Sequence, residues 1–199
     1  MKIACIVEGY GEVKAVPILL KRLHQWKTPD LAYPIIEEPI RIKRDRFINK
    51  KEEFNKYLKL AALKCGHDGW ILILLDADDD CPKELGIKIL DSVEECIPHC
   101  STSIVLANRE YEAWFIASAG SLNGQHGFTL NANEIENIEA ESPRDAKGWV
   151  KRHIATNLYS ETIDQLEFTK IMDLQEAFDK SRSFRKLCSE WEKQMRSRV

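Results

Sequence analysis

The chain has 199 residues, enough for one domain or one domain with an extension, and its 44% hydrophobic and 31% charged residues are typical of a soluble globular protein. Its net charge of −3 does not mark it as a nucleic-acid-binding protein, although residues 41–51 and 179–199 are basic and residues 76–80 and 134–141 are acidic. No apolar run approaches the ~20 residues of a membrane helix and the start does not resemble a signal peptide, so we expect a cytoplasmic protein without a membrane partner.

In chain order, the first part alternates short apolar segments with amphipathic ones. Strands are expected at 2–7, 33–42, 70–75 and 103–107, and the second of these is weakened by Pro34 and Pro39. Helices are expected at 12–26, 51–65, 82–96 and 111–117. This alternation predicts an α/β fold, a parallel sheet with helices on both faces.

The pattern changes after Gly120. Residues 120–133 are rich in Gly, Asn and His and are expected to form a loop. Helices are then expected at 143–154, 160–168 and 174–195. We therefore expect an α/β core over residues 1–120 and a C-terminal helical extension over residues 121–199 that packs on it.

The six cysteines form no Cys-x-x-Cys pair. Cys96 and Cys100 are the nearest pair, and Cys65 and His67 lie elsewhere in the sequence. A zinc site needs four ligands at defined spacing, so reduced thiols of a cytosolic protein are favoured over a zinc site.

Carboxylates follow two of the expected strands. Glu8 and Glu12 lie in the segment EGYGE after the first strand, and Asp76 and Asp78 lie in DAD after the 70–75 strand. Functional groups of parallel sheets gather at the carboxyl ends of strands, so we expect these acids to share one crevice if the strands are neighbours. Close carboxylates repel one another, and Mg²⁺ or Mn²⁺ would remove that repulsion with the oxygen ligands that these ions prefer.

Backbone geometry refines the roles of these acids. Asp76 and Asp78 would point the same way from extended backbone, and Gly9 and Gly11 allow a sharp turn before Glu12. Asp79 is expected to be solvated. Asp80 or Cys81 is expected to cap the next helix.

Other motifs do not fit. Gly9-Tyr10-Gly11 begins like a dinucleotide-binding fingerprint, but Lys14 occupies the place of its third glycine. The sequence has neither a GxxxxGK[ST] phosphate loop nor a GxSxG nucleophile elbow. A response-regulator receiver is a poorer fit, because the first strand ends in a single Glu followed by glycine.

The order of these motifs resembles the Toprim family, which has a Rossmann-like fold with a Glu after its first strand and Asp-x-Asp after a later one. EGYGE resembles the form found in OLD-type nucleases. A closer resemblance is to the Toprim-like family called domain of unknown function 4276, carried also by EYEAWF at 110–115, SPRDAK at 142–147 and SFRKL at 183–187. Asp145 departs from this pattern, because a basic residue is expected there.

The resemblance implies Mg²⁺- or Mn²⁺-dependent cleavage of nucleic acid, with DNA favoured over RNA. It implies catalytic roles for Glu8, Asp76 and Asp78 and a metal-binding role for these residues together with Glu12. It further implies a partner ATPase, with a role in defence against foreign DNA.

Further candidates come from position and resemblance, and are individually weaker. The secondary site candidates are Glu110, Glu112, Asp80, Lys14, Lys147 and Lys151. We expect Glu110 and Glu112 to lie on the 111–117 helix, with Glu112 favoured to face the site. The candidates for contact with nucleic acid are Arg41, Lys43, Arg44 and Arg46, on what is otherwise a solvated basic loop.

Two other functions remain open at this point. The chain could be a non-catalytic module that binds a partner protein or a nucleotide, with the acids holding a structural ion. It could also be a different Mg²⁺-dependent phosphotransfer enzyme. The oligomeric state is not determined by the sequence.

Overall fold

The computed structural model describes residues 1–156 and 159–197. Its strands are β1 (Lys2–Val7), β2 (Ile35–Ile36), β3 (Ile40–Arg41), β4 (Trp70–Asp76) and β5 (Ser101–Ala107). Its helices are α1 (Tyr10–Lys27), α2 (Arg44–Asn49), α3 (Lys51–Cys65), α4 (Pro82–Cys96), α5 (Ala113–Ala117), α6 (Ala119–Leu122), α7 (Ala132–Glu136), α8 (Ala146–Arg152), α9 (Glu161–Ile171), α10 (Leu174–Lys180) and α11 (Arg182–Arg196). None of the helices in this described part of the chain combines the length and apolar character that a membrane crossing requires.

The strands form one parallel sheet in the order β2-β1-β4-β5, and β3 also pairs with β1. The apolar strands β1 and β4 lie side by side at its centre, with Ile3 opposite Trp70 and Ile6 opposite Ile73. Their side chains are buried almost completely, as expected for strands covered on both faces. The carboxyl ends of β1 and β4 therefore lie next to each other.

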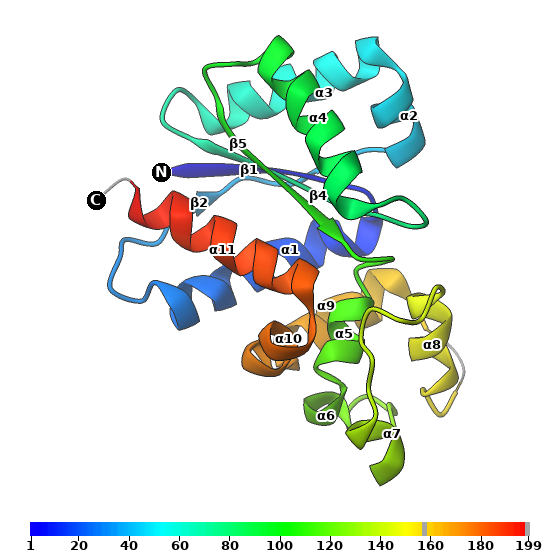
Figure 1. Cartoon of the computed structure of the whole chain (residues 1–199). Coiled ribbons are helices and arrows are strands. Elements are labelled where there is room, and N and C mark those ends of the chain that lie inside the picture. Colours follow the sequence, from blue (N-terminus) through cyan, green and yellow to red (C-terminus); the bar gives the residue numbers. More distant parts are fainter. Residues whose placement is uncertain (157–158, 198–199) are drawn as a thin grey trace.

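Helices cover both faces of this sheet (Figure 1). One face packs against α2, α3 and α4 through an apolar cluster that includes Ile71, Ile73 and Leu75 of β4. The opposite face packs against α1, α5, α9, α10 and α11 through a second cluster that includes Leu72 and Leu74. The alternation of β4 side chains between two separate cores confirms the expected α/β sheet with helices on both faces.

The structure corrects several predicted element boundaries in the first part of the chain. The expected 33–42 strand is two short strands, because Pro39 interrupts the segment between them. The expected 111–117 helix begins at Ala113, so Glu110 and Glu112 precede the helix rather than lie on it.

The predicted second half also changes in detail. The expected loop at 120–133 contains the end of α6 and the start of α7, and the expected 143–154 helix is confined to 146–152. The expected 174–195 helix is divided into α10 and α11, because the Ser181 side chain accepts a hydrogen bond from the Phe184 amide and caps a new helix. Helix periodicity alone does not reveal this cap.

The helices that follow the sheet share its core. Helix α9 packs against α1, where Gly11 lies so close to α9 that a Cβ atom would be 2.3 Å from the Glu161 carbonyl oxygen. Helix α11 runs along β5, and its buried Trp191 packs edge-on against Trp70 with ring centroids 6.1 Å apart. The α9 contact brings side chains of the second half to the carboxyl ends of the strands, whereas the Trp191 contact lies near their amino ends.

Candidate active site

Glu8 and Asp76 occupy the carboxyl ends of neighbouring strands. Glu8 follows the last residue of β1, and Asp76 is the last residue of β4. The condition for a shared crevice, that these two strands are neighbours, is met. The two carboxylates consequently lie at one edge of the sheet, where ligand sites of open α/β folds occur.

Glu12 is fixed by the turn between β1 and α1. Its Oε2 accepts hydrogen bonds from the backbone amides of Glu8 at 2.8 Å and Gly9 at 3.2 Å. The residue is only 4% exposed. Burial raises the pKa of Glu12 to about 7 against the effect of these hydrogen bonds, and the Glu112 and Glu8 carboxylates add to the rise.

Asp76 is surrounded by other carboxylates. Its Oδ1 accepts a hydrogen bond from the Tyr111 amide at 2.8 Å. Burial raises its pKa well above the usual value, and the carboxylates of Glu12, Glu112 and Glu8 raise it further. Ionised acids at this edge thus destabilise one another.

Glu8 has a carboxylate oxygen that is free to bind a ligand. Burial, followed by the nearby Asp78 carboxylate, raises its pKa to about 7, whereas Arg44 and Lys147 act in the opposite direction. Its Oε2 is buried and has no hydrogen-bond partner among the described residues. A buried carboxylate oxygen without a partner is costly, and a bound cation would satisfy it.

The second half of the chain completes the surroundings. Glu112 is 1% exposed, and its Oε1 accepts hydrogen bonds from the Tyr159 hydroxyl at 2.9 Å and the Gln165 amide at 3.2 Å. Burial raises its pKa. Glu112 is therefore buried close enough to Asp76 and Glu12 for its charge to raise their pKa values.

Glu110 and Lys147 form a separate link at the rim. Glu110 Oε2 accepts a hydrogen bond from the Lys147 amide at 2.8 Å, and the Lys147 Nζ pairs with Glu161 at 2.8 Å. Despite burial, which lowers it, the pKa of Lys147 is raised by Glu161, Glu112 and Glu110. Asp145, where a basic residue is expected, caps α8 by accepting a hydrogen bond from the Gly148 amide.

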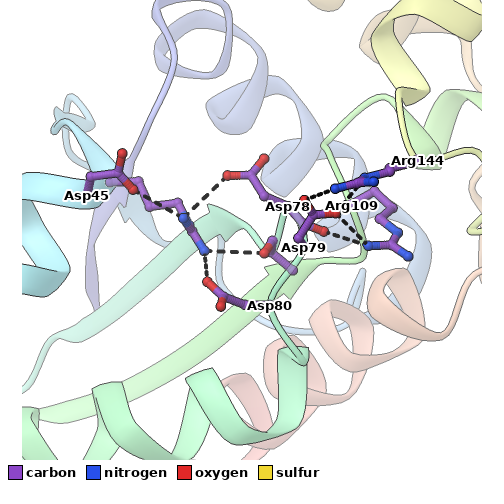
Figure 2. A network of polar contacts seen from close by, with 8 residues as sticks. Asp45, Asp78, Asp79, Asp80, Arg109 and Arg144 are labelled. Atoms are coloured by element: carbon purple, nitrogen blue, oxygen red, sulfur yellow. Dashed lines mark hydrogen bonds and ion pairs between the residues drawn. The ribbon is translucent and has the colours of Figure 1, made fainter.

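Asp78 does not point with Asp76, so that expectation is wrong. Strand β4 ends at Asp76, and Asp78 has a φ of 48°, in the left-handed region. Its carboxylate is half exposed and lies 3.3 Å from the Arg44 guanidinium (Figure 2). The turn therefore pairs Asp78 with Arg44, while its charge still acts on the nearby Glu8.

The remaining two aspartates of the opening acidic run form ion pairs. Asp80 pairs with Arg44 (Figure 2). It does not cap α4, whose N-cap residue is Cys81. Asp79 is not simply solvated, because it pairs with Arg144 and Arg109. These contacts tie the turn after β4 to α2, to the segment after β5 and to the segment before α8.

The basic residues at 41–46 are not all on a solvated loop. Arg44 begins α2, is 8% exposed and donates to the Ala77 carbonyl at 3.2 Å as well as pairing with the aspartates. Arg41 lies over the Tyr10 ring at 4.0 Å, and Arg46 pairs with Glu53. Lys43 is exposed. Arg44 is therefore oriented toward the protein interior, whereas the others remain near the surface.

The other two lysine candidates are not drawn into the acidic cluster. Lys14 on α1 and Lys151 on α8 are exposed, and neither side chain forms an ion pair within the described part of the chain. Of the lysines considered from the sequence, Lys147 is the one that interacts electrostatically with the buried acids.

The donor set suits a hard cation, although its oxygens are not gathered into a ligand sphere. Among the described residues, no group of three or more His, Cys, Asp and Glu side chains has the arrangement of a metal site, and this includes the cysteines considered for zinc. Two observations nevertheless fit a cation at Glu8, Glu12 and Asp76. The carboxylates raise one another's pKa values, and the buried Glu8 Oε2 has no hydrogen-bond partner among the described residues. The three side chains would have to be rearranged to form such a centre.

Sequence reasoning missed several residues of this region. Tyr159 and Gln165 contact Glu112, and Glu161 contacts Lys147. Arg109 and Arg144 hold Asp79. Arg144 lies in the SPRDAK segment and could have been singled out there, but nothing in the local sequence distinguishes the other four from ordinary surface or core residues.

Comparison with known proteins places the chain in a family. None of the curated proteins compared matches it. The C-terminal region of the Xanthomonas campestris pv. campestris OLD protein aligns over 98% of this chain and 96% of that chain, with 13% sequence identity and a TM-score of 0.39. The family model described as domain of unknown function DUF4276 matches residues 7–192. Since that match spans most of the sequence, the chain belongs to the DUF4276 family.

Proposed function

We propose that this chain is a Toprim-type nuclease that uses Mg²⁺ or Mn²⁺ to cleave phosphodiester bonds. The observation that carries the proposal is the group of mutually repelling carboxylates at the ends of β1 and β4, where Glu8 also has an unpartnered buried oxygen. A protein that gathers acids in this way loses stability unless a cation or protons neutralise them.

Glu8, Glu12 and Asp76 are the residues that would hold the cation, and the buried Glu112, whose charge acts on Asp76 and Glu12, would support them. When bound, a divalent cation polarises the phosphate and lowers the pKa of a water nucleophile. Asp78 could join these ligands only by leaving Arg44, which lies 3.3 Å away. We therefore assign Asp78 to the same site as a ligand that requires a change of partner.

Positive groups at the rim would orient the substrate. Lys147 is half-buried beside Glu110, Glu112 and Glu161, and it would reach a phosphate by exchanging its contact with Glu161. Arg41 and Lys43 lie nearer the surface, where they could contact the backbone of a nucleic acid. The motif resemblance favours DNA as substrate and an ATPase as partner in defence against foreign DNA, and both belong to this proposal.

The direct test is cleavage of supercoiled plasmid DNA, single-stranded DNA and RNA with Mg²⁺ or Mn²⁺. We expect cation-dependent cleavage that Glu8→Gln reduces by about a hundredfold, because the substitution removes a charged metal ligand. Asp91→Asn is the matched control, since Asp91 is exposed on α4 and should leave the rate unchanged. Equal inertness of the wild type and Glu8→Gln with every substrate, with no cation binding by calorimetry, would instead support a non-catalytic module.

The pKa values predict that the cation-free protein loses stability as the pH rises. Glu8 and Glu12 have a usual pKa of 4.5 and a folded-state pKa of about 7, so the folded state binds more protons between these values. The free energy of unfolding contributed by these two groups is then greatest near pH 4.5–5, and it falls as the pH rises to about 7–8. Glu141 and Glu190 have lowered pKa values, so their opposite effect lies below this window.

We expect the melting temperature without cation to fall by roughly 5 °C between about pH 5 and pH 8, because a few kcal/mol of stability are lost in a chain of this size. Millimolar Mn²⁺ should reduce the fall, since it binds the ionised carboxylates of the folded state. Scanning calorimetry with and without EDTA measures both effects. A melting temperature that rises steadily across this window would contradict the assigned carboxylate repulsion.

A further inference from the structure

The open edge of β5 lies in a groove between two helices. Within the described residues, β4 is the strand that pairs with β5, and no strand pairs with its other edge. The groove has a volume of about 740 Å³ and is lined by residues of α4, β5 and α11. Figure 1 shows α4 and α11 on the two sides of β5. An unpaired edge presents alternating backbone N–H and C=O groups that can accept another extended segment.

The α4 wall of this groove is apolar beyond the first turn of the helix, where Lys83 also lines the groove. Ile87 is 52% exposed and Leu90 is 36% exposed, although both are large hydrophobic residues. Half-buried Ile104 of β5 lies in the same groove. Side chains of an added strand that point toward α4 would therefore be covered best if they were apolar.

The α11 wall is basic. Helix α11 runs antiparallel to β5, since Gln194 accepts from Ser101 at 2.7 Å and Glu190 accepts from Ser103 at 2.6 Å. Arg182 and Lys193 also line the groove on this side, and neither forms an ion pair with any described residue. Their eleven-residue separation corresponds to about 16 Å along the helix, the length of about five strand residues.

The acids in the groove are already engaged. Glu190 binds Ser103 and pairs with Lys186 at 2.5 Å. Glu141 accepts hydrogen bonds from Ser181, Ser183 and Asn108. The unpaired charges along the α11 wall are therefore positive, and the wall is complementary to an acidic ligand.

We propose that the edge of β5 accepts an extended, acidic segment of a partner protein, which continues the sheet as an additional strand. Successive residues of a strand face opposite sides of a sheet, so the segment should alternate apolar residues toward α4 with Asp or Glu toward α11. The backbone ladder supplies affinity, and the two walls supply specificity.

A second copy of this chain is a poorer occupant. Two β5 edges related by a two-fold axis normal to the sheet would pair antiparallel and would set one α11 beside the other. Arg182 and Lys193 of both copies would then approach like charges. This surface does not involve Glu8, Glu12 or Asp76, so the inference is independent of the proposed nuclease activity.

The test uses labelled peptides of about nine residues, long enough to span the edge. The probe alternates Glu with Val or Ile, and its counterparts carry Lys in place of Glu or a central Pro that removes a ladder donor. Fluorescence anisotropy should show saturable binding of the Glu peptide and at least fivefold weaker binding of the other two. Absence of binding up to about 1 mM, or equal binding of the Glu and Lys peptides, would overturn the proposal.

Variants of exposed residues assign the binding to this groove. Ile87→Glu and the double variant Arg182→Glu, Lys193→Glu should each weaken binding at least fivefold, whereas Leu63→Glu on the outer surface of α3 should have no effect. Asp76→Asn should bind the peptide like the wild type, which separates this surface from the acidic site. Duplex DNA serves as the alternative ligand. If it binds the wild type and Ile87→Glu but not the double variant, the groove is a nucleic-acid site and the proposal is overturned. A concentration-dependent dimer that Ile104→Lys dissociates would identify self-association and would also overturn the proposal.

Discussion

Asp76→Asn is expected to lose cation-dependent cleavage by a factor of about a hundred or more, while the folded protein becomes no less stable. The activity is lost because a neutral amide is a poor substitute for a carboxylate that binds a divalent cation and organises the phosphate. Stability is maintained because the amide oxygen can still accept the hydrogen bond from the Tyr111 amide. The change also removes the charge that Glu12, Glu112 and Glu8 repel.

Loss of activity without loss of stability distinguishes a cation-binding role of Asp76 from a purely structural one. The melting temperature without cation should rise by a few degrees near pH 8 and change little near pH 5, where the cluster is largely protonated. Calorimetric titration with Mn²⁺ should show a large loss of affinity even if the chain cleaves only in the presence of a partner. A destabilised variant, or one that retains more than about a tenth of wild-type cleavage and Mn²⁺ affinity, would remove Asp76 from the proposed centre.

The centre of the sheet was predictable because the information is local. The apolar runs at Lys2–Val7 and Trp70–Asp76 are short, are bounded by turn residues and are buried on both faces. That β1 and β4 are neighbours did not follow from the sequence, because β2 and β3 lie between them in the chain, and it is the structure that brings Glu8 and Asp76 to the same end of the sheet. The strand ends therefore indicate where a site is to be expected, whereas its composition depends on which strands pair.

The orientation of individual charges was not predictable in the same way. The left-handed backbone at Asp78 turns its carboxylate toward Arg44, and a sequence pattern for an aspartate after a strand does not specify φ. Arg44 lies in a basic segment that reads as solvated, yet α2 directs it inward while its neighbour Lys43 stays exposed. Which member of a charged run faces the interior depends on the packing of α2 on the sheet.

The residues that the second half of the chain contributes to the site could not be predicted from the sequence for a related reason. Tyr159 and Gln165 reach Glu112 across about fifty residues of sequence, and their contacts depend on the position of α9 against α1. Neither residue belongs to a motif with a chemical meaning of its own. The site can thus be located from the sequence, but its buried supporting contacts require the three-dimensional packing.

Gly11 provides a direct test of that packing, because Gly11→Ala should destabilise the protein strongly. A Cβ atom at this position would lie 2.0 Å from the Gln165 Oε1 and 2.3 Å from the Glu161 carbonyl oxygen. The second of these is backbone, so α9 has to move away from α1. Overpacking of this kind costs about 1–3 kcal/mol, and we expect the upper end, a fall of roughly 6–12 °C in melting temperature.

Gly86→Ala is the matched control, because it is the same substitution in α4 with the nearest side-chain atom 3.9 Å from the new Cβ. There the change should stabilise the protein by up to about 1 kcal/mol, since alanine favours the helix and meets no obstacle. Opposite signs in thermal unfolding would show that the close approach of α9 to Gly11 fixes the second half against the sheet. Gly11→Ala should also weaken Mn²⁺ binding, because displacement of α9 moves Gln165 away from Glu112. Equal stability of the two variants would mean that α9 can shift freely, and the buried support of Glu112 would then not depend on this contact.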